Sequence, residues 1–354
     1  MEMRKFGLTD LMVSQVCLGC MGFGEANSGM HAWTVDYPTS ARLIHEAQGL
    51  GINFFDTAMS YQNGTSEEFL GRALRENNSR EKSVIATKFM PQIHSQLYPE
   101  LAPKAYIERC LEDSLRRLQT DYIDLYIMHA WDESIAPLEL MTILDGLVKS
   151  GKVRHIGVSN AFSWQVAQAN EIAKAHGLTP FASMQGHYNL IFREEEREML
   201  PYCQKEGMAY TPYSSLASGR LARLTADSKR AQLDTYAKGK YEATKDLDQT
   251  IIQRVAELAE KKNTSMSAIA LTWLMQKGTF PIMGVTKDRH LTTLSQLEGV
   301  TLTPEESQYL EENYHAHDLV GMMKSRMWSD SISYKQKVIN QLGQIRENSC
   351  VTFC

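Results

Sequence analysis

Eight short apolar segments alternate with longer amphipathic segments along most of the chain, and this alternation restricts the possible folds more than any other feature. The apolar segments are strand candidates at residues 14–20, 52–56, 83–88, 122–129, 153–159, 181–185, 208–213 and 280–285. The amphipathic segments are typical of helices: residues 103–118 carry an apolar stripe, and residues 137–152 include a C-cap at Gly151. Strands separated by helices call for a parallel sheet whose faces are covered.

The number of strands predicts an α/β fold, the closed (β/α)8 or TIM barrel, which takes about 250 residues before insertions. The alternative is an open, doubly wound sheet. Such a sheet would place a G-x-G-x-x-G phosphate loop between its first strand and its first helix. The glycines near the start, in GCMGFG at residues 19–24, have a different order, and we therefore expect the barrel.

Three segments lie outside the alternation. Residues 3–16 read as a hairpin that covers the barrel floor, and residues 219–250 read as a long loop or lid. Beyond about residue 318 the alternation stops. We therefore predict a barrel domain over residues 1–318 and a C-terminal extension over residues 319–354, which is helical around 332–345.

The composition is that of a globular protein, with 354 residues, 43% of them hydrophobic and 22% charged, and a formal net charge of -5. Lys and Arg are scattered singly, which argues against binding to nucleic acid. No apolar stretch reaches the roughly 18 to 20 residues that span a bilayer. The start, MEMRKFGLTD, lacks the apolar run of a secretory signal. We expect no membrane partner and a cytoplasmic location.

Six cysteines do not indicate a disulfide framework in a chain of this size. Cys17 and Cys20 have the spacing of a redox or metal pair, but they lie in a predicted strand, where residues three apart point to opposite faces. Burial as two small apolar side chains is the simpler interpretation. His315 and His317 lack a recognisable set of further ligands, so we expect no metal site.

Four chemically active side chains lie at or just beyond the ends of neighbouring predicted strands. Asp56 ends the second strand, Lys88 the third and His129 the fourth, and Tyr61 follows in the loop after Asp56. Each has an ordinary explanation when considered alone: a helix cap, a solvated strand end, a buried histidine or a packed tyrosine. In a (β/α)8 barrel, however, all strands end on one face, where active sites are built. We predict that the four form an active site.

Five motifs carry a resemblance to a known family. In chain order they are FFDTAMSYQNGTSEEFLGRAL, IATKF, LYIMHAWD, GKVRHIGVSN and TPYSSLASGRL. In order and spacing, from about residue 4 to residue 315, the sequence resembles the aldo-keto reductases, and HAWD and SGKVRHIGVSN are most similar to the bacterial and fungal branch with aryl-alcohol dehydrogenase-like members. The resemblance implies a (β/α)8 oxidoreductase that reversibly reduces aldehydes and ketones to alcohols with NADPH.

The resemblance assigns roles to the four strand-end residues. Tyr61 would donate a proton to the substrate oxygen, and His129 would orient and polarise that oxygen by hydrogen bonding. Free tyrosine holds its proton up to about pH 10, and a cationic Lys88 nearby would stabilise the phenolate and lower that pKa. Asp56 would in turn keep the buried Lys88 charged.

The resemblance also implies which residues hold the cofactor. We expect the nicotinamide carboxamide to be hydrogen-bonded by Ser159, Asn160 and Gln185, and the ring of Tyr213 to stack on the nicotinamide. A turn is expected to pass under the pyrophosphate, and it is formed by Ser214, Leu216, Ser218, Gly219 and Arg220. The last strand runs through Gly284 into a helix start that can receive phosphate. Lys287 and Arg289 suit a 2′-phosphate there, and solvated surface charges are the alternative for both.

One stretch departs from the family pattern. The family often has Arg where His290 stands, and a Glu-Asn pair that grips adenine where Thr293 and Leu294 stand. We expect NADPH rather than NADH, because two basic residues remain and no acidic residue replaces them. Asp288 is a mild argument for NADH.

The expected partner is a small-molecule carbonyl compound. Apolar residues after strand ends favour an aromatic or medium-chain substrate, or else belong to the core: Trp33, Met59, Phe89, Trp131 and Phe162. The alternative function is a cofactor-sensing regulatory subunit with little turnover, since some relatives on this fold serve chiefly as partners of membrane channels. The oligomeric state stays open.

Overall fold

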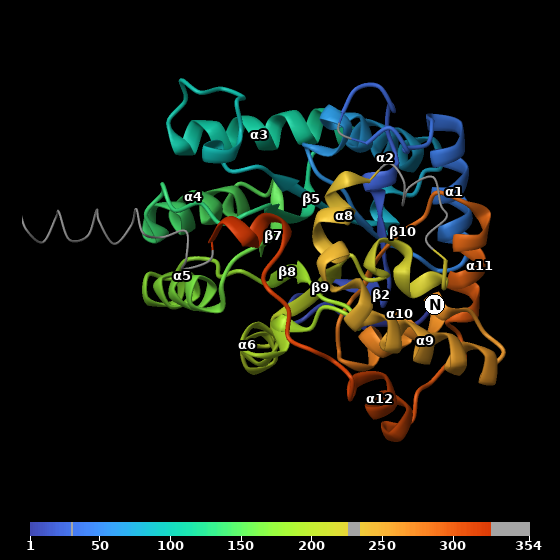
Figure 1. The fold of residues 1–354 in the computed structure, drawn as a ribbon. Helices are drawn as coiled ribbons and strands as arrows, with labels where there is room; N and C mark the ends of the chain where they lie inside the picture. The colour runs from blue at the N-terminus through green and yellow to red at the C-terminus, as the bar shows by residue number, and fades with distance from the viewer. Residues whose placement is uncertain (30, 226–233, 327–354) are drawn as a thin grey trace, which may run out of the picture. The chain divides into compact units, whose positions relative to one another are not determined.

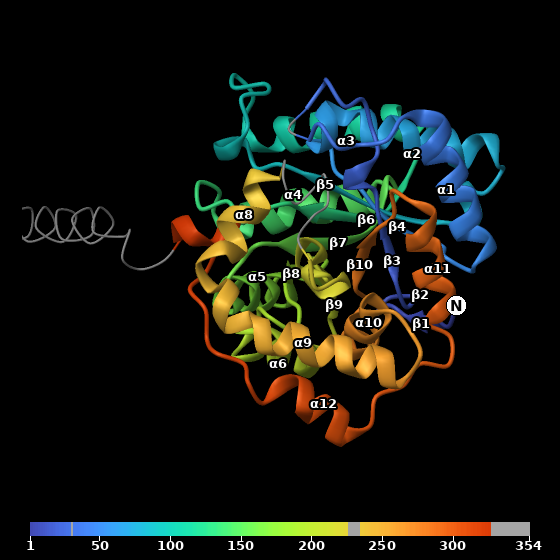
Figure 2. The ribbon, with the colours of Figure 1, turned by 45° about the vertical axis from the view of Figure 1, so that its right-hand side comes forward.

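The computed structural model describes residues 1–29, 31–225 and 234–326. Eight strands of these residues form one sheet, and helices surround it in both ribbon views (Figure 1, Figure 2). The strands are β3 (Cys17–Gly19), β4 (Phe54–Asp56), β5 (Val84–Phe89), β6 (Ile123–Met128), β7 (Val153–Ser159), β8 (Ser183–His187), β9 (Ala209–Tyr213) and β10 (Ile282–Gly284). Within the described ranges, no helix is both long and apolar enough to cross a membrane.

The sheet is a nearly closed barrel. Its strands follow one another in the order β10-β3-β4-β5-β6-β7-β8-β9, and each neighbouring pair is parallel. At the seam, the N–H of Phe280, just before β10, donates to the carbonyl oxygen of Tyr210 in β9 at 2.9 Å. The predicted (β/α)8 fold is confirmed, and the open doubly wound sheet is not formed.

Helices after the strands form the outer layer. They are α1 (Tyr37–Gly49), α2 (Thr65–Glu76), α3 (Pro103–Leu118), α4 (Pro137–Lys149), α5 (Ser163–Ala175), α6 (Met199–Glu206), α8 (Thr235–Tyr241), α9 (Lys245–Lys261), α10 (Met266–Gln276), α11 (Asp288–Gln296) and α12 (Pro304–Glu311). Short 3₁₀ helices are η1 (Cys20–Gly22), η2 (Tyr61–Gly64), η3 (Arg80–Lys82), η4 (Gln92–His94), η5 (Glu194–Glu196), η6 (Ala217–Ala222) and η7 (Glu242–Thr244). Local signals set the helix starts: the side chain of Asp36 caps α1, and Thr303 and Glu306 form a capping box on α12.

The long connection between β9 and β10 differs from the prediction. The sequence predicts a loop or lid over residues 219–250, but the described part of this segment contains η6, α8, η7 and the start of α9. The prediction of a loop is therefore wrong, and that of a lid stays a prediction. The first turn of α9 resembles a loop because it buries no apolar side chain: Leu247 is 50% exposed, and the buried apolar stripe begins at Ile251. Asp248, in the first turn of α9, is buried, and its carboxylate is paired there with His317 Nε2 at 3.0 Å.

A two-stranded hairpin closes the floor of the barrel, as the sequence predicts. Its strands β1 (Met3–Lys5) and β2 (Met12–Ser14) pair antiparallel. Phe6, between them, packs edge-on against Phe54 with 5.3 Å between ring centroids, and its centroid lies 5.1 Å from that of Phe280. Both contacts are at the amino ends of barrel strands, so the hairpin fills the end opposite the candidate site.

Cys17 and Cys20 lie in different parts of the core. Cys17, in β3, belongs to the apolar cluster that includes Phe6 and Phe54, whereas Cys20 starts η1 and packs in the larger cluster with the outer helices. Both thiols are free and buried, and burial raises the pKa of each well above its usual value. Burial is confirmed, although the strand ends one residue earlier than predicted.

The chain divides by its internal contacts into two units, Met1–His317 and Asp318–Cys354. The barrel lies in the first unit. In the second, the structure describes a 3₁₀ helix, η8 (Gly321–Arg326). The helix expected around residues 332–345 lies outside the described residues.

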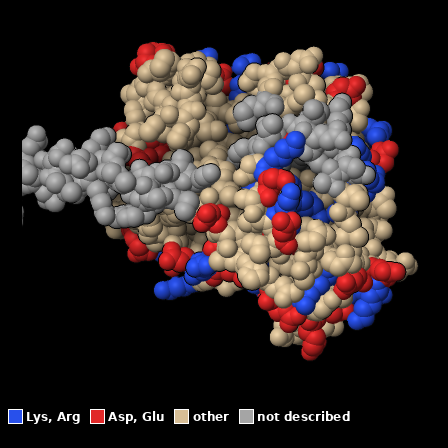
Figure 3. Space-filling view, in the orientation of Figure 1, with Lys and Arg blue, Asp and Glu red and all other residues tan. Residues whose placement is uncertain are grey.

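Charges of both signs are interspersed on the face of the molecule drawn in Figure 3, where Lys and Arg lie among Asp and Glu. Several exposed pairs join neighbouring turns of a helix, such as Arg42 with Glu46 and Arg72 with Glu76. Exposed pairs of this kind contribute little to stability.

The carboxyl group of Glu195 makes stability depend on pH. Burial raises its pKa to about 7. The negative charge of Glu194 also raises this pKa, whereas the neighbouring hydroxyl of Tyr210 lowers it. The folded protein therefore holds a proton that the unfolded chain, with a carboxyl pKa near 4.5, has already lost. For this group, the free energy of unfolding is highest below about pH 4.5 and falls as the pH rises to about 7.

Glu195→Gln is expected to remove this loss. The variant should exceed the wild type in stability by about 2 to 4 kcal/mol at pH 8 and by less than about 1 kcal/mol near pH 5. Urea denaturation at the two pH values measures the difference, with Glu68→Gln at an exposed position as the control. An equal effect of Glu195→Gln on stability at both pH values would contradict the raised pKa of Glu195.

Candidate active site

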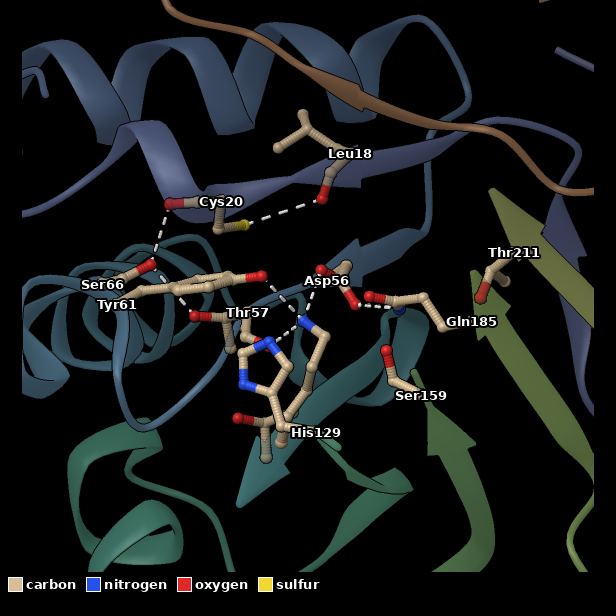
Figure 4. A network of polar contacts seen from close by, with 12 residues as sticks. Leu18, Cys20, Asp56, Thr57, Tyr61, Ser66, His129, Ser159, Gln185 and Thr211 are labelled. Atoms are coloured by element: carbon tan, nitrogen blue, oxygen red, sulfur yellow. Dashed lines mark hydrogen bonds and ion pairs between the residues drawn. The ribbon is translucent and has the colours of Figure 1, made fainter. Parts of the chain in front are cut away.

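Lys88 is the centre of a buried polar cluster at the carboxyl ends of the strands. Its ammonium donates to Asp56 Oδ1 at 2.7 Å, to the carbonyl oxygen of Thr57 at 2.7 Å and to the hydroxyl of Tyr61 at 3.2 Å. The side chains of Lys88 and Asp56 are 0% and 4% exposed. Asp56, Tyr61 and His129 turn toward one another from separate elements (Figure 4). The structure thus brings the four predicted residues together.

The register of β4 and β5 positions the cluster. Asp56 ends β4 beside Ala86, and Lys88 lies two residues beyond Ala86, on the same side of the sheet. The chain continues along β5 after β4 ends, because the N–H of Met59 donates to the carbonyl oxygen of Lys88 at 3.1 Å. This extension brings Tyr61 to the end of the Lys88 side chain.

The backbone directly after Tyr61 has an uncommon conformation. Gln62 and Asn63 have φ values of 47° and 51°. Non-glycine residues in this left-handed region cost about 1 to 3 kcal/mol each and gather at functional sites, where neighbouring contacts compensate. One such contact is the hydrogen bond from Gln62 Nε2 to the carbonyl oxygen of Glu25 at 2.7 Å. The turn stops the extension at Tyr61 and leads into α2.

His129 directly follows β6 and is held by its backbone. Its N–H donates to the carbonyl oxygen of Phe89 at 2.9 Å, and its ring stands edge-on to Tyr61 with 5.8 Å between centroids. Burial, together with the positive charge of Lys88, lowers the pKa of His129 to about 3. The imidazole is therefore neutral at neutral pH. Its buried Nδ1 has no hydrogen-bond partner among the described residues.

The protonation states of Lys88 and Tyr61 follow from opposing effects. Burial lowers the pKa of Lys88, but the negative charge of Asp56 and the hydrogen bonds outweigh burial and raise that pKa, so the ammonium stays charged. Burial raises the pKa of Tyr61, whereas Lys88 lowers it and Asp56 raises it. The net shift for Tyr61 is upward, which corrects the expectation of a lowered pKa. Lys88 acts in the expected direction, but burial is the larger effect.

Gln185 makes a contact that the sequence does not predict. Its Nε2 donates to Asp56 Oδ2 at 2.9 Å, while Asp56 Oδ1 accepts from Lys88. Gln185 lies on β8, four strands from β4 in either direction around the barrel, so only closure of the sheet brings the two side chains together. The carbonyl of Thr57 is a second contact that was missed. Gln185 ends the strand predicted over residues 181–185, although it lies in the middle of β8, and Thr57 directly follows β4.

Ser159, Asn160 and Tyr213 lie together at the ends of β7 and β9. Asn160 Nδ2 donates to the hydroxyl of Ser159 at 2.9 Å and to the carbonyl oxygen of His129 at 2.8 Å. The hydroxyl of Tyr213 donates to Asn160 Oδ1 at 2.9 Å. These residues, which the resemblance assigns to the nicotinamide, therefore form one network with the backbone of His129.

The turn after β9 suits a diphosphate group. Positive φ values of 54°, 47°, 56° and 99° occur at Ser214, Ala217, Ser218 and Gly219. Turns with such residues can form anion-binding concavities, although the N–H groups of Ala217 and Gly219 donate within this turn, to the carbonyl oxygens of Ser214 and Leu216 at 2.8 Å each. The guanidinium of Arg220 lies 4.8 Å from the ring centroid of Tyr241, and Leu216 is partly buried beside the turn. Binding of the pyrophosphate at this turn stays a prediction.

The start of α11 carries the residues expected at a 2′-phosphate. Lys287 is the N-cap residue, Arg289 lies in the first turn, and both are exposed, as is Gly284 at the end of β10. Asp288 pairs with Arg42 of α1 at 2.7 Å. Sequence reasoning missed this pair, because its members are 246 positions apart. Arg42 offsets the negative charge that Asp288 places at the helix start.

The apolar residues after the strand ends do not share one environment. Phe89 stacks on Tyr126 with 5.1 Å between centroids, in the core between sheet and helices. As the neighbour of Lys88 in β5, it points to the opposite side of the sheet. Phe89 therefore belongs to the core, the second of the two interpretations given for these residues. The other four are buried or partly buried near the strand ends: Met59, Trp131, Trp33 and Phe162.

Residues 15–315 match the model of the aldo/keto reductase family. The versiconal hemiacetal acetate reductase of Aspergillus parasiticus is 37% identical over an alignment of 337 positions that covers 89% of this chain and 97% of that protein. A putative aryl-alcohol dehydrogenase of Schizosaccharomyces pombe is 36% identical over an alignment of 338 positions that covers 87% of this chain and 94% of that protein.

A solved structure is similar as well. The crystal structure of a thermostable aldo-keto reductase in complex with the inhibitor epalrestat matches with a TM-score of 0.70 and 26% sequence identity, over 88% of this chain and 100% of that chain. The match in sequence therefore agrees with the barrel described above. The chain belongs to the aldo/keto reductase family of NAD(P)H-dependent oxidoreductases.

Proposed function

We propose that the protein reduces aldehydes and ketones to alcohols with NADPH, and that Tyr61 supplies the proton. The main support is the hydrogen bond of 3.2 Å from Lys88 Nζ to the Tyr61 hydroxyl, in a buried cluster where Asp56 keeps Lys88 charged. A buried ammonium next to a phenol stabilises the phenolate that proton transfer leaves behind.

The reaction adds a hydride to the carbonyl carbon and a proton to the carbonyl oxygen. Bound NADPH supplies the hydride. Tyr61 hydrogen-bonds to the carbonyl oxygen and transfers its proton as negative charge develops there, so that the Tyr61 O–H bond breaks and that of the alcohol forms. Lys88 stabilises the phenolate until a proton from solvent restores it. Neutral His129 orients the carbonyl oxygen by a hydrogen bond.

Support for NADPH over NADH comes from the charges at the start of α11. Lys287 and Arg289 add two positive charges where the helix N-terminus already favours an anion. The charge of Asp288 is offset by Arg42 at 2.7 Å, which weakens the argument for NADH. A 2′-phosphate would therefore meet net positive charge.

An aromatic or otherwise bulky apolar substrate is the second part of the proposal. Trp131 and Phe162 follow β6 and β7 at the end of the barrel that carries the polar cluster. At the same end, in the first turns of α4 and α5, Leu138 and Trp164 are 42% and 61% exposed. The name of the Aspergillus parasiticus relative, a hemiacetal acetate reductase, is compatible with a large substrate.

The purified protein is expected to consume NADPH when a panel of aldehydes is added, with higher kcat/KM for aromatic than for short aliphatic members. The decrease in NADPH absorbance measures the rates, and parallel assays with NADH measure cofactor choice. Tight binding of NADPH without turnover of any carbonyl compound would contradict the proposal and favour a cofactor-sensing regulatory subunit.

A further inference from the structure

Three nearly parallel rings are in contact at the ends of β8 and β9. The imidazole of His187 stacks on Phe192 with 4.0 Å between centroids and on Tyr213 with 5.5 Å, in each case with an interplanar angle of 10°. His187 and Tyr213 are also direct neighbours in the register of the two strands. His187 therefore lies against the ring that is expected to stack on the nicotinamide.

Buried polar groups fix the orientation of His187. Its Nε2 lies 2.7 Å from the hydroxyl of Tyr241. Asn189 donates to the same hydroxyl at 3.1 Å and to the carbonyl oxygen of Ser214 at 2.9 Å. His187, Asn189 and Tyr241 are only 4%, 0% and 1% exposed. The imidazole is thus attached to α8 through its Nε2, and Asn189 links the same tyrosine hydroxyl to the turn after β9.

Tyr213 has its own attachment at the far end of the ring, where its hydroxyl donates to Asn160 Oδ1 at 2.9 Å. The bond through the hydroxyl does not by itself stop the ring from rotating about its long axis. Lys240 Nζ also lies 4.6 Å from the ring centroid, but an ammonium on a flexible side chain restricts the tilt of the ring less than a flat neighbour does. The stacked imidazole opposes that rotation, because it lies against the face of the ring. Stacking of the nicotinamide on Tyr213 requires the two ring planes to be aligned, since dispersion contacts weaken steeply when the two surfaces separate.

We propose that His187 is a positioning residue, which holds the ring of Tyr213 at the tilt at which it receives the nicotinamide. This inference rests on the proposed function, since it presupposes a nicotinamide cofactor on Tyr213. His187 acts through Tyr213 and touches neither cofactor nor substrate. Its position has a sequence signal, because it follows Gln185 by two residues and so faces the same side of β8.

Two substitutions separate the stacking of His187 from its polar bond. His187→Phe keeps a flat ring and loses the bond to Tyr241, whereas His187→Asn keeps a polar group and loses the ring. Titration of NADPH, followed by protein fluorescence, is expected to show a Kd about 2- to 10-fold higher for His187→Asn and near that of the wild type for His187→Phe. His176→Asn, at an exposed position, is the matched control. His187→Gln replaces His187→Asn if the latter does not fold.

A double-mutant cycle with Tyr213→Ala distinguishes positioning from a general effect on the fold. Without the Tyr213 ring, His187→Asn is expected to cause no further rise in Kd. An unchanged Kd in His187→Asn, equal losses in the Asn and Phe variants, or additive effects in the cycle would overturn the inference. Failure of the wild type to bind NADPH would overturn the proposed function, and the inference with it.

Discussion

Replacing Tyr61 with phenylalanine is expected to lower kcat by roughly 10²- to 10⁴-fold, the usual contribution of a well-placed general acid. The phenylalanine ring keeps the packing and loses only the hydroxyl that lies 3.2 Å from Lys88 Nζ. The Kd of NADPH should not change, because the residues expected to hold it lie on other elements. Steady-state NADPH oxidation measures kcat, and fluorescence titration measures Kd.

Tyr309→Phe is the control for this substitution, since the hydroxyl of Tyr309 donates to Glu257 at an exposed site. Its kcat should equal that of the wild type. Wild-type turnover in Tyr61→Phe would remove Tyr61 as the proton donor.

Replacing Lys88 with methionine is expected both to abolish turnover and to destabilise the fold. The variant leaves the Asp56 carboxylate, which is 4% exposed, without its cation. Removal of one partner from a buried ion pair typically costs about 3 to 5 kcal/mol. Urea denaturation measures the loss, and Lys104→Met, at a side chain that is 70% exposed, is the control.

A second substitution separates the two effects of Lys88. In the double variant Lys88→Met with Asp56→Asn, neither of the two positions carries a buried charge, so much of the stability should return. Turnover should stay absent, because the Tyr61 phenolate would still lack a neighbouring cation. Recovery of turnover together with stability would contradict the role of Lys88 in proton transfer.

The fold could be predicted because its signals are local. Apolar segments of strand length gave all eight barrel strands, and β7 (Val153–Ser159) has the predicted ends. Alternation with helices then allowed few arrangements. The prediction of a loop failed over the described part of residues 219–250. The mainly polar start of α9 resembles a loop in the sequence, and the contact of Asp248 with His317 becomes visible only in the structure.

The candidate site was predictable where it depends on strand ends and not where it depends on register or burial. Asp56 and Lys88 could be paired in advance, since they end neighbouring strands. The bond from Gln185 to Asp56 and the stack of His187 on Tyr213 require the closed barrel and its register. The net pKa shift of Tyr61 depends on how deeply the ring is buried, and no sequence motif records that depth.

The pH dependence of hydride transfer tests most directly whether Tyr61, and not His129, donates the proton. In the structure, the pKa of His129 is lowered to about 3, so its charged form is scarce at neutral pH. The single-turnover rate of NADPH oxidation should therefore be constant from about pH 5 to pH 8 and fall only at alkaline pH, where Tyr61 loses its proton. A rate that falls as the pH rises through about 6 to 7 would indicate an imidazolium donor and contradict the account.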